Sequence, residues 1–175
     1  GVDEFVMVSH ENPPAAVAAL RELAASHANF VLIETDANLG FAKGCNIGAL
    51  AASGDLVLFL NPDAILAPGG GEQLKASARM ALVRPWIIGA RILNRNGSEQ
   101  AGGRRGELTP RSAAISFLRL DRLFPGLRSL HWEADDLPDA MTEVPTVSGA
   151  AMMMRRDDFL EIGGFDESYF LHVED

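Results

Sequence analysis

The chain of 175 residues has few of the features that build disulfide-stabilised, metal-cluster or membrane-spanning proteins. Its one cysteine, Cys45, excludes an intrachain disulfide framework and any multi-cysteine zinc or iron–sulfur site. Uncharged stretches such as residues 44–54 stop well short of the roughly 18 apolar residues that a membrane span needs. The G-x-G-x-x-G fingerprint and the phosphate-loop pattern are both absent, which argues against an NAD-dependent enzyme and a phosphate-loop NTPase. An initiator methionine is absent too, and we expect a fragment.

What is present has the balance of a globular domain. Apolar residues make up 47% and charged residues 22% of the chain, and its length predicts one domain over residues 1–175. The net charge of −9 is uneven: residues 1–74 carry −7, residues 75–128 carry +8 and residues 129–175 carry −10. The basic segment is more typical of a solvated arginine-rich surface, although it also fits phosphates or an anionic membrane face. The overall acidity argues against nucleic-acid binding.

Apolar patterning predicts alternating strands and helices. The expected strands are residues 5–8, 30–34, 56–60, 86–93 and 150–155, and the expected helices are 14–26, 42–52, 72–82, 112–123 and 157–162. The run LVLFL at 56–60 has no polar alternation, which indicates a strand buried on both faces. The order strand–helix–strand–helix–strand predicts an α/β fold with a doubly wound, mostly parallel sheet flanked by helices.

In open parallel sheets, ligands bind beyond the carboxyl ends of the strands. Those ends carry residues 9–12, 36–40 and Asn61-Pro62-Asp63. Asp63 follows the fully apolar strand, and one carboxylate together with phosphate oxygens is a common way to hold Mg²⁺ or Mn²⁺. A turn with a capping aspartate remains the alternative interpretation.

Two further stretches carry polar side chains of interest. Residues 38–48 place three glycines four apart at the start of a helix, which fits either an anion site or close packing on the sheet. Residues 163–175 concentrate four carboxylates beside aromatic residues, which fits a general base or a solvated chain end. Cys45 is expected to be a packed small apolar residue.

Four groups of residues occur in the order that is typical of the family 2 glycosyltransferases, and the chain resembles their bacterial rhamnosyltransferase-like branch. The matching groups are 38–42 with Gly44 and Asn46, 58–63, 147–150 with 152–156, and 163–167 with Phe170, Glu174 and Asp175. Each motif is weak alone, whereas four in sequence are specific. The likeness runs from about Phe5 to the last residue.

The resemblance implies a GT-A type, Rossmann-like fold, a nucleotide-diphosphate-sugar donor, Mg²⁺ or Mn²⁺, and inversion at the anomeric carbon. Asn61 and Asp63 stand in the place of the family's D-x-D motif, so Asp63 is expected to contact the metal and the diphosphate. Asp175 matches the general base that deprotonates the acceptor, with Glu174 in support. The other donor-binding residues implied are Asn38, Gly40, Lys43, Asn46, Ser148, Gly149 and Asp166.

The chain also departs from the family pattern. The opening strand–helix unit and the part beyond Asp175 are expected to be missing, so the catalytic domain is incomplete. Ser9 or His10 stands at the aspartate that is usual in the second strand; an alternative alignment makes residues 8–10 the opening strand.

Three functions compete at this point. The first is a metal-dependent transferase for a glycan or polyprenyl-linked acceptor in cell-surface polysaccharide synthesis, cytoplasmic and at the inner face of the membrane, with dTDP-rhamnose as the leading donor. The second is an inactive fragment or a sugar-nucleotide-binding module. The third is a nucleotidyltransferase, against which the absence of an early G-x-G-T-R-L-like loop counts.

Overall fold

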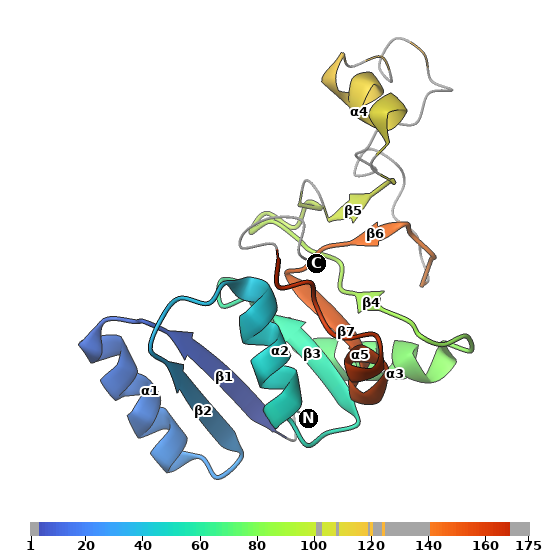
Figure 1. Cartoon of the computed structure of the whole chain (residues 1–175). Helices are drawn as coiled ribbons and strands as arrows, with labels where there is room; N and C mark the ends of the chain where they lie inside the picture. The colour runs from blue at the N-terminus through green and yellow to red at the C-terminus, as the bar shows by residue number, and fades with distance from the viewer. Residues whose placement is uncertain are drawn as a thin grey trace. The chain divides into compact units, whose positions relative to one another are not determined.

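The computed structural model describes residues 4–100, 103–107, 109–118, 120, 124 and 141–168 (Figure 1). Its strands are β1 (Phe5–His10), β2 (Phe30–Thr35), β3 (Leu56–Leu60), β4 (Ile88–Gly89), β5 (Arg104–Arg105), β6 (Thr146–Val147) and β7 (Ala151–Arg155). Its helices are α1 (Pro14–Ser26), α2 (Phe41–Ala51), α3 (Gly70–Met80), α4 (Pro110–Phe117) and α5 (Arg156–Glu161).

The chain divides into two compact units. Unit 1 comprises Gly1–Phe59, Leu66–Trp86 and Met153–Asp175, and unit 2 comprises Leu60–Ile65 and Ile87–Met152. None of the helices in the described ranges has the length and apolar character required to cross a bilayer.

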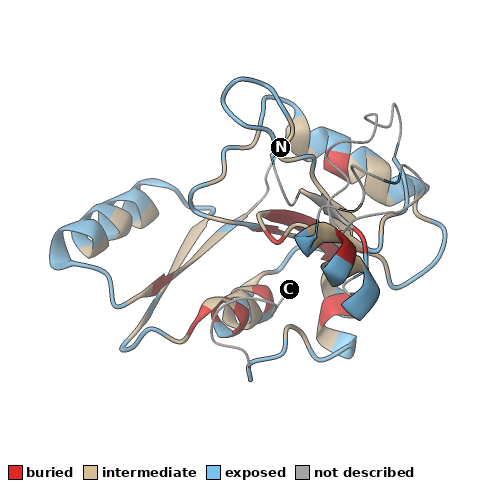
Figure 2. Ribbon diagram, turned by 90° about the horizontal axis from the view of Figure 1, so that it is seen from above, coloured by how far each residue is buried: buried red, intermediate tan, exposed pale blue. Residues whose placement is uncertain are grey.

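In unit 1, β1 and β2 form a parallel pair connected through α1. The register joins Phe5 to Phe30 and continues to His10 and Thr35, and the rings of Phe5 and Phe30 stack with centroids 5.2 Å apart. A parallel pair needs a crossover connection, which α1 supplies. No residue of α1 is buried (Figure 2).

A second sheet has the strand order β3–β7–β4. The Arg156 N–H donates to Asp55 O at one end of β3, and the Asn61 N–H donates to Ala150 O at the other, each at 3.0 Å. The end of β7 therefore meets the start of β3, and the two strands run antiparallel, as Figure 1 also shows.

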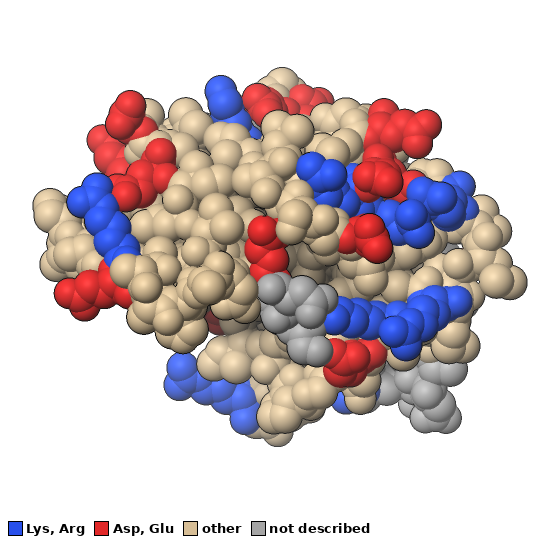
Figure 3. All heavy atoms as spheres, turned by 90° about the horizontal axis from the view of Figure 1, so that it is seen from below, with Lys and Arg blue, Asp and Glu red and all other residues tan. Residues whose placement is uncertain are grey.

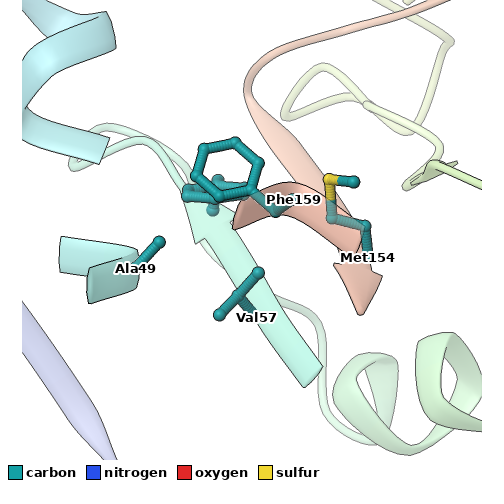
Figure 4. Close-up of a cluster of buried hydrophobic side chains, with 5 residues drawn as sticks. Ala49, Val57, Met154 and Phe159 are labelled. Carbon is teal, nitrogen blue, oxygen red and sulfur yellow. The ribbon is translucent and has the colours of Figure 1, made fainter. Parts of the chain in front are cut away.

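The core of unit 1 gathers around β3, β7, α2 and α5. Ala49, Val57, Phe59, Met154 and Phe159 form its buried cluster (Figure 4). Arg156 at the start of α5 donates from Nε to Ala49 O (2.9 Å) and from Nη2 to Leu50 O (3.1 Å). These bonds satisfy carbonyls at the C-terminus of α2, which lack partners inside the helix.

In unit 2, β5 pairs antiparallel with β6. Helix α4 begins behind a capping box in which Thr109 and Ser112 bond each other's backbone N–H groups. This cap explains why α4 begins at Pro110, two residues before the expected start.

The α/β class and the expected elements are confirmed in outline. Helix α1 has the expected bounds, and β3 is the expected strand. Its expected burial on both faces is wrong: Val57 and Phe59 are buried, whereas the alternate residues Leu56 and Leu58 are half-buried and Leu60 is exposed, so one face of the strand is only partly covered. The strand expected over residues 86–93 is reduced to Ile88–Gly89, and β5 and β6 are not among the expected strands.

Candidate functional site

The end of β3 in unit 2 leads into a tight turn that carries Asp63. The Ala64 N–H donates to Asn61 O at 3.0 Å and closes a turn with Pro62 and Asp63 at its centre. Proline favours the first central position of such turns, because its ring fixes φ. Asp63 is exposed, so the turn presents a carboxylate directly beyond a strand end, as the sequence predicts.

The side chain of Asn61 provides a second oxygen atom, Oδ1, in the same turn as the Asp63 carboxylate. Its Oδ1 is buried and accepts no hydrogen bond from the described residues. Buried polar atoms are nearly always paired, so an orphaned amide oxygen is notable. Amide and carboxylate oxygens are the ligand types that Mg²⁺ and Mn²⁺ prefer, and this donor set fits such a cation. Within the described ranges, however, no three His, Cys, Asp or Glu side chains form a cluster able to hold a metal.

Ser148 and Gly149 lie in the same unit as this turn. Asn61 N–H is bonded to Ala150 O, and the Ala150 N–H donates to Ser148 Oγ at 3.3 Å. Gly149 is buried between these two residues. The structure therefore brings together Asn61, Asp63, Ser148 and Gly149, which are distant in the sequence.

In unit 1, the N-terminus of α2 carries the predicted residues Asn38, Gly40 and Lys43. Asn38 Oδ1 accepts a hydrogen bond from Gly40 N–H at 3.1 Å, and Gly40 precedes the helix with a φ of 84°. Lys43 is exposed in the first turn. A helix N-terminus with a nearby ammonium group favours anions.

Further along α2, Asn46 binds the segment that contains Asp166. Its Oδ1 accepts from Phe165 N–H (2.9 Å), and its Nδ2 donates to Phe165 O and Glu167 Oε1 (3.0 Å each). Asp166 is exposed, and hydrogen bonds from the hydroxyl and N–H of Ser168 hold its pKa below the usual range. Its carboxylate is therefore ionised at neutral pH.

Ser9 and His10, at the end of β1, are held by neighbouring side chains. Ser9 is buried and accepts from Asn12 Nδ2 at 2.8 Å. His10 Nδ1 lies 2.7 Å from Thr35 Oγ1. Cys45 packs against the core cluster of unit 1, as expected.

The predicted general base Asp175 and its supporting carboxylate Glu174 lie outside the described residues. The other predicted residues fall into two groups, one in each unit. In unit 2 hydrogen bonds connect Asn61 through Ala150 to Ser148, whereas in unit 1 they join Asn38 to Gly40 and, separately, Asn46 to the segment around Asp166. The role of Glu167 as a partner of Asn46 is not evident from the sequence. The run Gly-Gly-Phe-Asp-Glu at 163–167 is the one signal that marks the segment.

Comparison with known proteins connects these groups to a family. The model of glycosyl transferase family 2 matches residues 2–163, a range that includes every predicted site residue except Asp166, Glu174 and Asp175. Two curated relatives are the N-acetylglucosaminyl-diphospho-decaprenol L-rhamnosyltransferases of Mycobacterium tuberculosis strains CDC 1551 / Oshkosh and ATCC 25618 / H37Rv. Each is 28% identical over 171 residues, covering 84% of this chain and 51% of the relative.

The chain thus spans about half the length of the curated relatives it matches. The matched range of the family model is much longer than half of the chain and covers the α/β elements from β1 to α5. With the turn of Asp63 and the start of α2 inside that range, sequence and architecture agree, and the chain belongs to glycosyl transferase family 2.

Proposed function

We propose that this chain forms part of the catalytic domain of an inverting, metal-dependent glycosyltransferase. Its donor is a nucleotide-diphosphate-sugar, and its acceptor is a hydroxyl group of a glycan or lipid-linked glycan. The observation that carries the proposal is the family match over residues 2–163, within which Asp63 stands on a turn directly beyond β3.

The donor's diphosphate is assigned to the turn at Asn61–Asp63 in unit 2. In unit 1, Lys43 and the first N–H groups of α2 favour an anionic group of the donor on their own account. A divalent cation held by Asp63 and the diphosphate oxygens would neutralise the charge that gathers on the leaving group. Ser148 and Gly149 shape the sugar pocket beside the turn. Asp166, in unit 1, remains a predicted donor-binding residue.

The proton chemistry is assigned to the carboxylates at the end of the chain. An acceptor hydroxyl is a poor nucleophile, so a base must take its proton as it attacks the anomeric carbon. Asp175 is proposed for this step, with Glu174 in support. The bond from the acceptor oxygen to the anomeric carbon forms as the bond to the diphosphate oxygen breaks, which inverts the configuration.

The acceptor is proposed to be lipid-linked, because the curated relatives are named for a diphospho-decaprenol substrate. A polyprenyl acceptor lies at a membrane, and the basic segment 75–128 fits an anionic membrane surface at the cytoplasmic side. Figure 3 shows Lys and Arg side chains with Asp and Glu on the same face. Equal binding to vesicles of neutral and of anionic lipid would remove this part of the proposal.

The proposed function is tested by nucleotide release from UDP-, GDP- and dTDP-sugars in the presence of Mn²⁺. We expect one donor class to be turned over, and Asp63→Ala to lower the rate by about 10²–10³-fold. Asp175→Asn is expected to lower it by about 10²–10⁴-fold. Glu22→Ala, which removes an exposed carboxylate of α1, is the matched control and should leave the rate unchanged.

A sugar-nucleotide-binding module without turnover is the second candidate, because the chain covers about half of its curated relatives. Calorimetric titration with UDP, GDP and dTDP in the presence of Mn²⁺ separates the two candidates. Binding that Asp63→Ala weakens, without any nucleotide release, supports the module. The absence of metal-dependent binding to all three nucleotides would refute both.

A further inference from the structure

Asn46 makes an unusual set of contacts with the segment 163–168, which we call the Phe165 loop. Its carboxamide bonds both the N–H and the C=O of Phe165, so the side chain pairs with that residue as a second peptide group would. A third bond joins Nδ2 to Glu167 Oε1. Helix α2 and the Phe165 loop, 119 residues apart in the chain, are thereby fixed to each other in unit 1.

These bonds use the whole donor capacity of the side chain. An asparagine amide has two N–H groups, and here one donates to Phe165 O and the other to Glu167 Oε1. Neither is left to bind a phosphate or sugar oxygen. A direct donor contact through Nδ2 would require Asn46 to release the Phe165 loop.

The rest of the loop is built around the same contact. Gly163 and Gly164, both with positive φ, follow helix α5, and a Cβ at Gly164 would lie 2.5 Å from Asn46 Oδ1. The Phe165 ring packs against Phe59 and Phe159, with centroid distances of 5.1 Å to each. The loop backbone is therefore shaped so that the Asn46 side chain can reach it.

We propose that Asn46 is a positioning residue, which fixes the Phe165 loop and, through it, Asp166. It acts on the reaction through the loop and does not bind the donor. The inference rests on the proposed function for its effect on turnover, whereas the loop contact itself is independent of that function. It also gives Glu167 a role as the partner of Asn46.

The first test follows the loop directly, by amide hydrogen exchange of the peptide that covers residues 163–168. Asn46→Asp keeps the shape and the acceptor for Phe165 N–H, loses both donors and places a second carboxylate against Glu167. Exchange in the loop should become about tenfold faster. Adding Glu167→Gln restores a donor between the two side chains and should return exchange to within about threefold of wild type. Asn94→Asp, which alters a similar amide bonded within its own turn in unit 2, is the control and should leave the loop unchanged.

The second test separates positioning from donor binding. For the nucleoside diphosphate that the wild type binds with Mn²⁺, Asn46→Asp should keep Kd within about twofold, while kcat falls at least tenfold and recovers with Glu167→Gln. A tenfold weaker Kd with unchanged loop exchange would overturn the proposal in favour of a direct donor contact. Unchanged exchange in Asn46→Asp would overturn it as well.

The exchange measurement needs no turnover. A wild-type chain that neither binds nor releases nucleotide would refute the proposed function, while loop exchange would still decide the role of Asn46. If Asn46→Asp does not fold, Glu167→Ala removes one of the three bonds from an exposed side chain. It should speed exchange in the loop about threefold, and no change would count against the proposal.

Discussion

Gly44 lies where helix α2 passes close to His10 of strand β1. A Cβ at this position would lie 2.6 Å from His10 Nε2. The ring cannot turn away freely, because its Nδ1 is hydrogen-bonded to Thr35 Oγ1 at 2.7 Å. We expect Gly44→Ala to lower the free energy of unfolding by about 1–3 kcal/mol, measured by urea denaturation.

Gly48, one turn later in the same helix, is the matched control. Its added Cβ would make an ordinary 3.5 Å contact with Val8 Cγ2. Because alanine is the better helix former, Gly48→Ala should leave the free energy of unfolding unchanged or raise it by up to about 1 kcal/mol. Equal losses in both variants would contradict the close approach of α2 to His10.

Asp158 and Arg84 form an ion pair in unit 1. The side chain of Asp158 is 6% exposed, and Arg84 donates to it from both Nε and Nη2. These hydrogen bonds hold the pKa of Asp158 below its usual range, with the charge of Arg84 in support. The pair therefore stabilises the fold above the unfolded pKa of about 3.9 and ceases to do so as the pH falls through the lower folded pKa.

We expect Asp158→Asn to unfold at lower urea concentration than wild type at pH 7, and the difference to shrink as the pH is lowered through the carboxyl range. The exposed pair of Arg21 and Glu34 is the comparison, and Glu34→Gln should produce a smaller difference at pH 7. A difference between wild type and Asp158→Asn that is the same at every pH would show that the charge of Asp158 is not what stabilises the pair.

At the scale of elements, the helices and strands that sequence predicts best are those with a long apolar run or with prolines or glycines at their ends. Helix α1 has the bounds expected from its two prolines and its apolar face, and β3 is the expected LVLFL run. The strands β5 and β6 have two residues each, too few for a period of two to be visible, and their pairing depends on residues more than 40 positions apart.

In the candidate site too, local features are predicted from the sequence and long-range contacts are not. The turn of Asn61–Asp63 is predicted from local order alone, because an apolar strand, a proline and an aspartate follow one another. The bonds of Asn46 to Phe165 and Glu167 join α2 to the loop after α5, and no local pattern carries that information. The long-range partner of a polar side chain is fixed by how the helices pack, which appears only in the structure.

Phe159 is the side chain through which α5 holds the core of unit 1. It is 1% exposed and packs on the rings of Phe59 and Phe165 at 4.8 and 5.1 Å. We expect Phe159→Ala to lower the free energy of unfolding by about 3–5 kcal/mol, from lost apolar burial and the cavity left behind. Phe117 in α4 is 88% exposed, so Phe117→Ala should change stability by less than about 0.5 kcal/mol. The free energy of unfolding of both variants is measured by urea denaturation, and a similar loss in the two would refute the assigned core.

At the scale of the whole molecule, the chain passes four times between the two compact units. The strands β3 and β7 each contribute residues to both: β3 changes unit after Phe59, and β7 changes unit after Met152. Independent domains are instead joined at exposed linkers where few contacts cross. Neither unit can lose β3 or β7 without breaking a strand of the other, so we expect one cooperative unfolding transition.

Pulsed hydrogen exchange across a urea series measures this, with peptides from α2 reporting on unit 1 and peptides from residues 87–93 reporting on unit 2. Both should unfold at the same midpoint in wild type. Phe159→Ala, which lies in unit 1, should shift both midpoints equally, because β3 and β7 each contribute residues to both units and one cooperative transition unfolds them together. A shift seen only in the α2 peptides would show that the units unfold separately, and would place the turn of Asp63 and the start of α2 on independently stable parts of the chain.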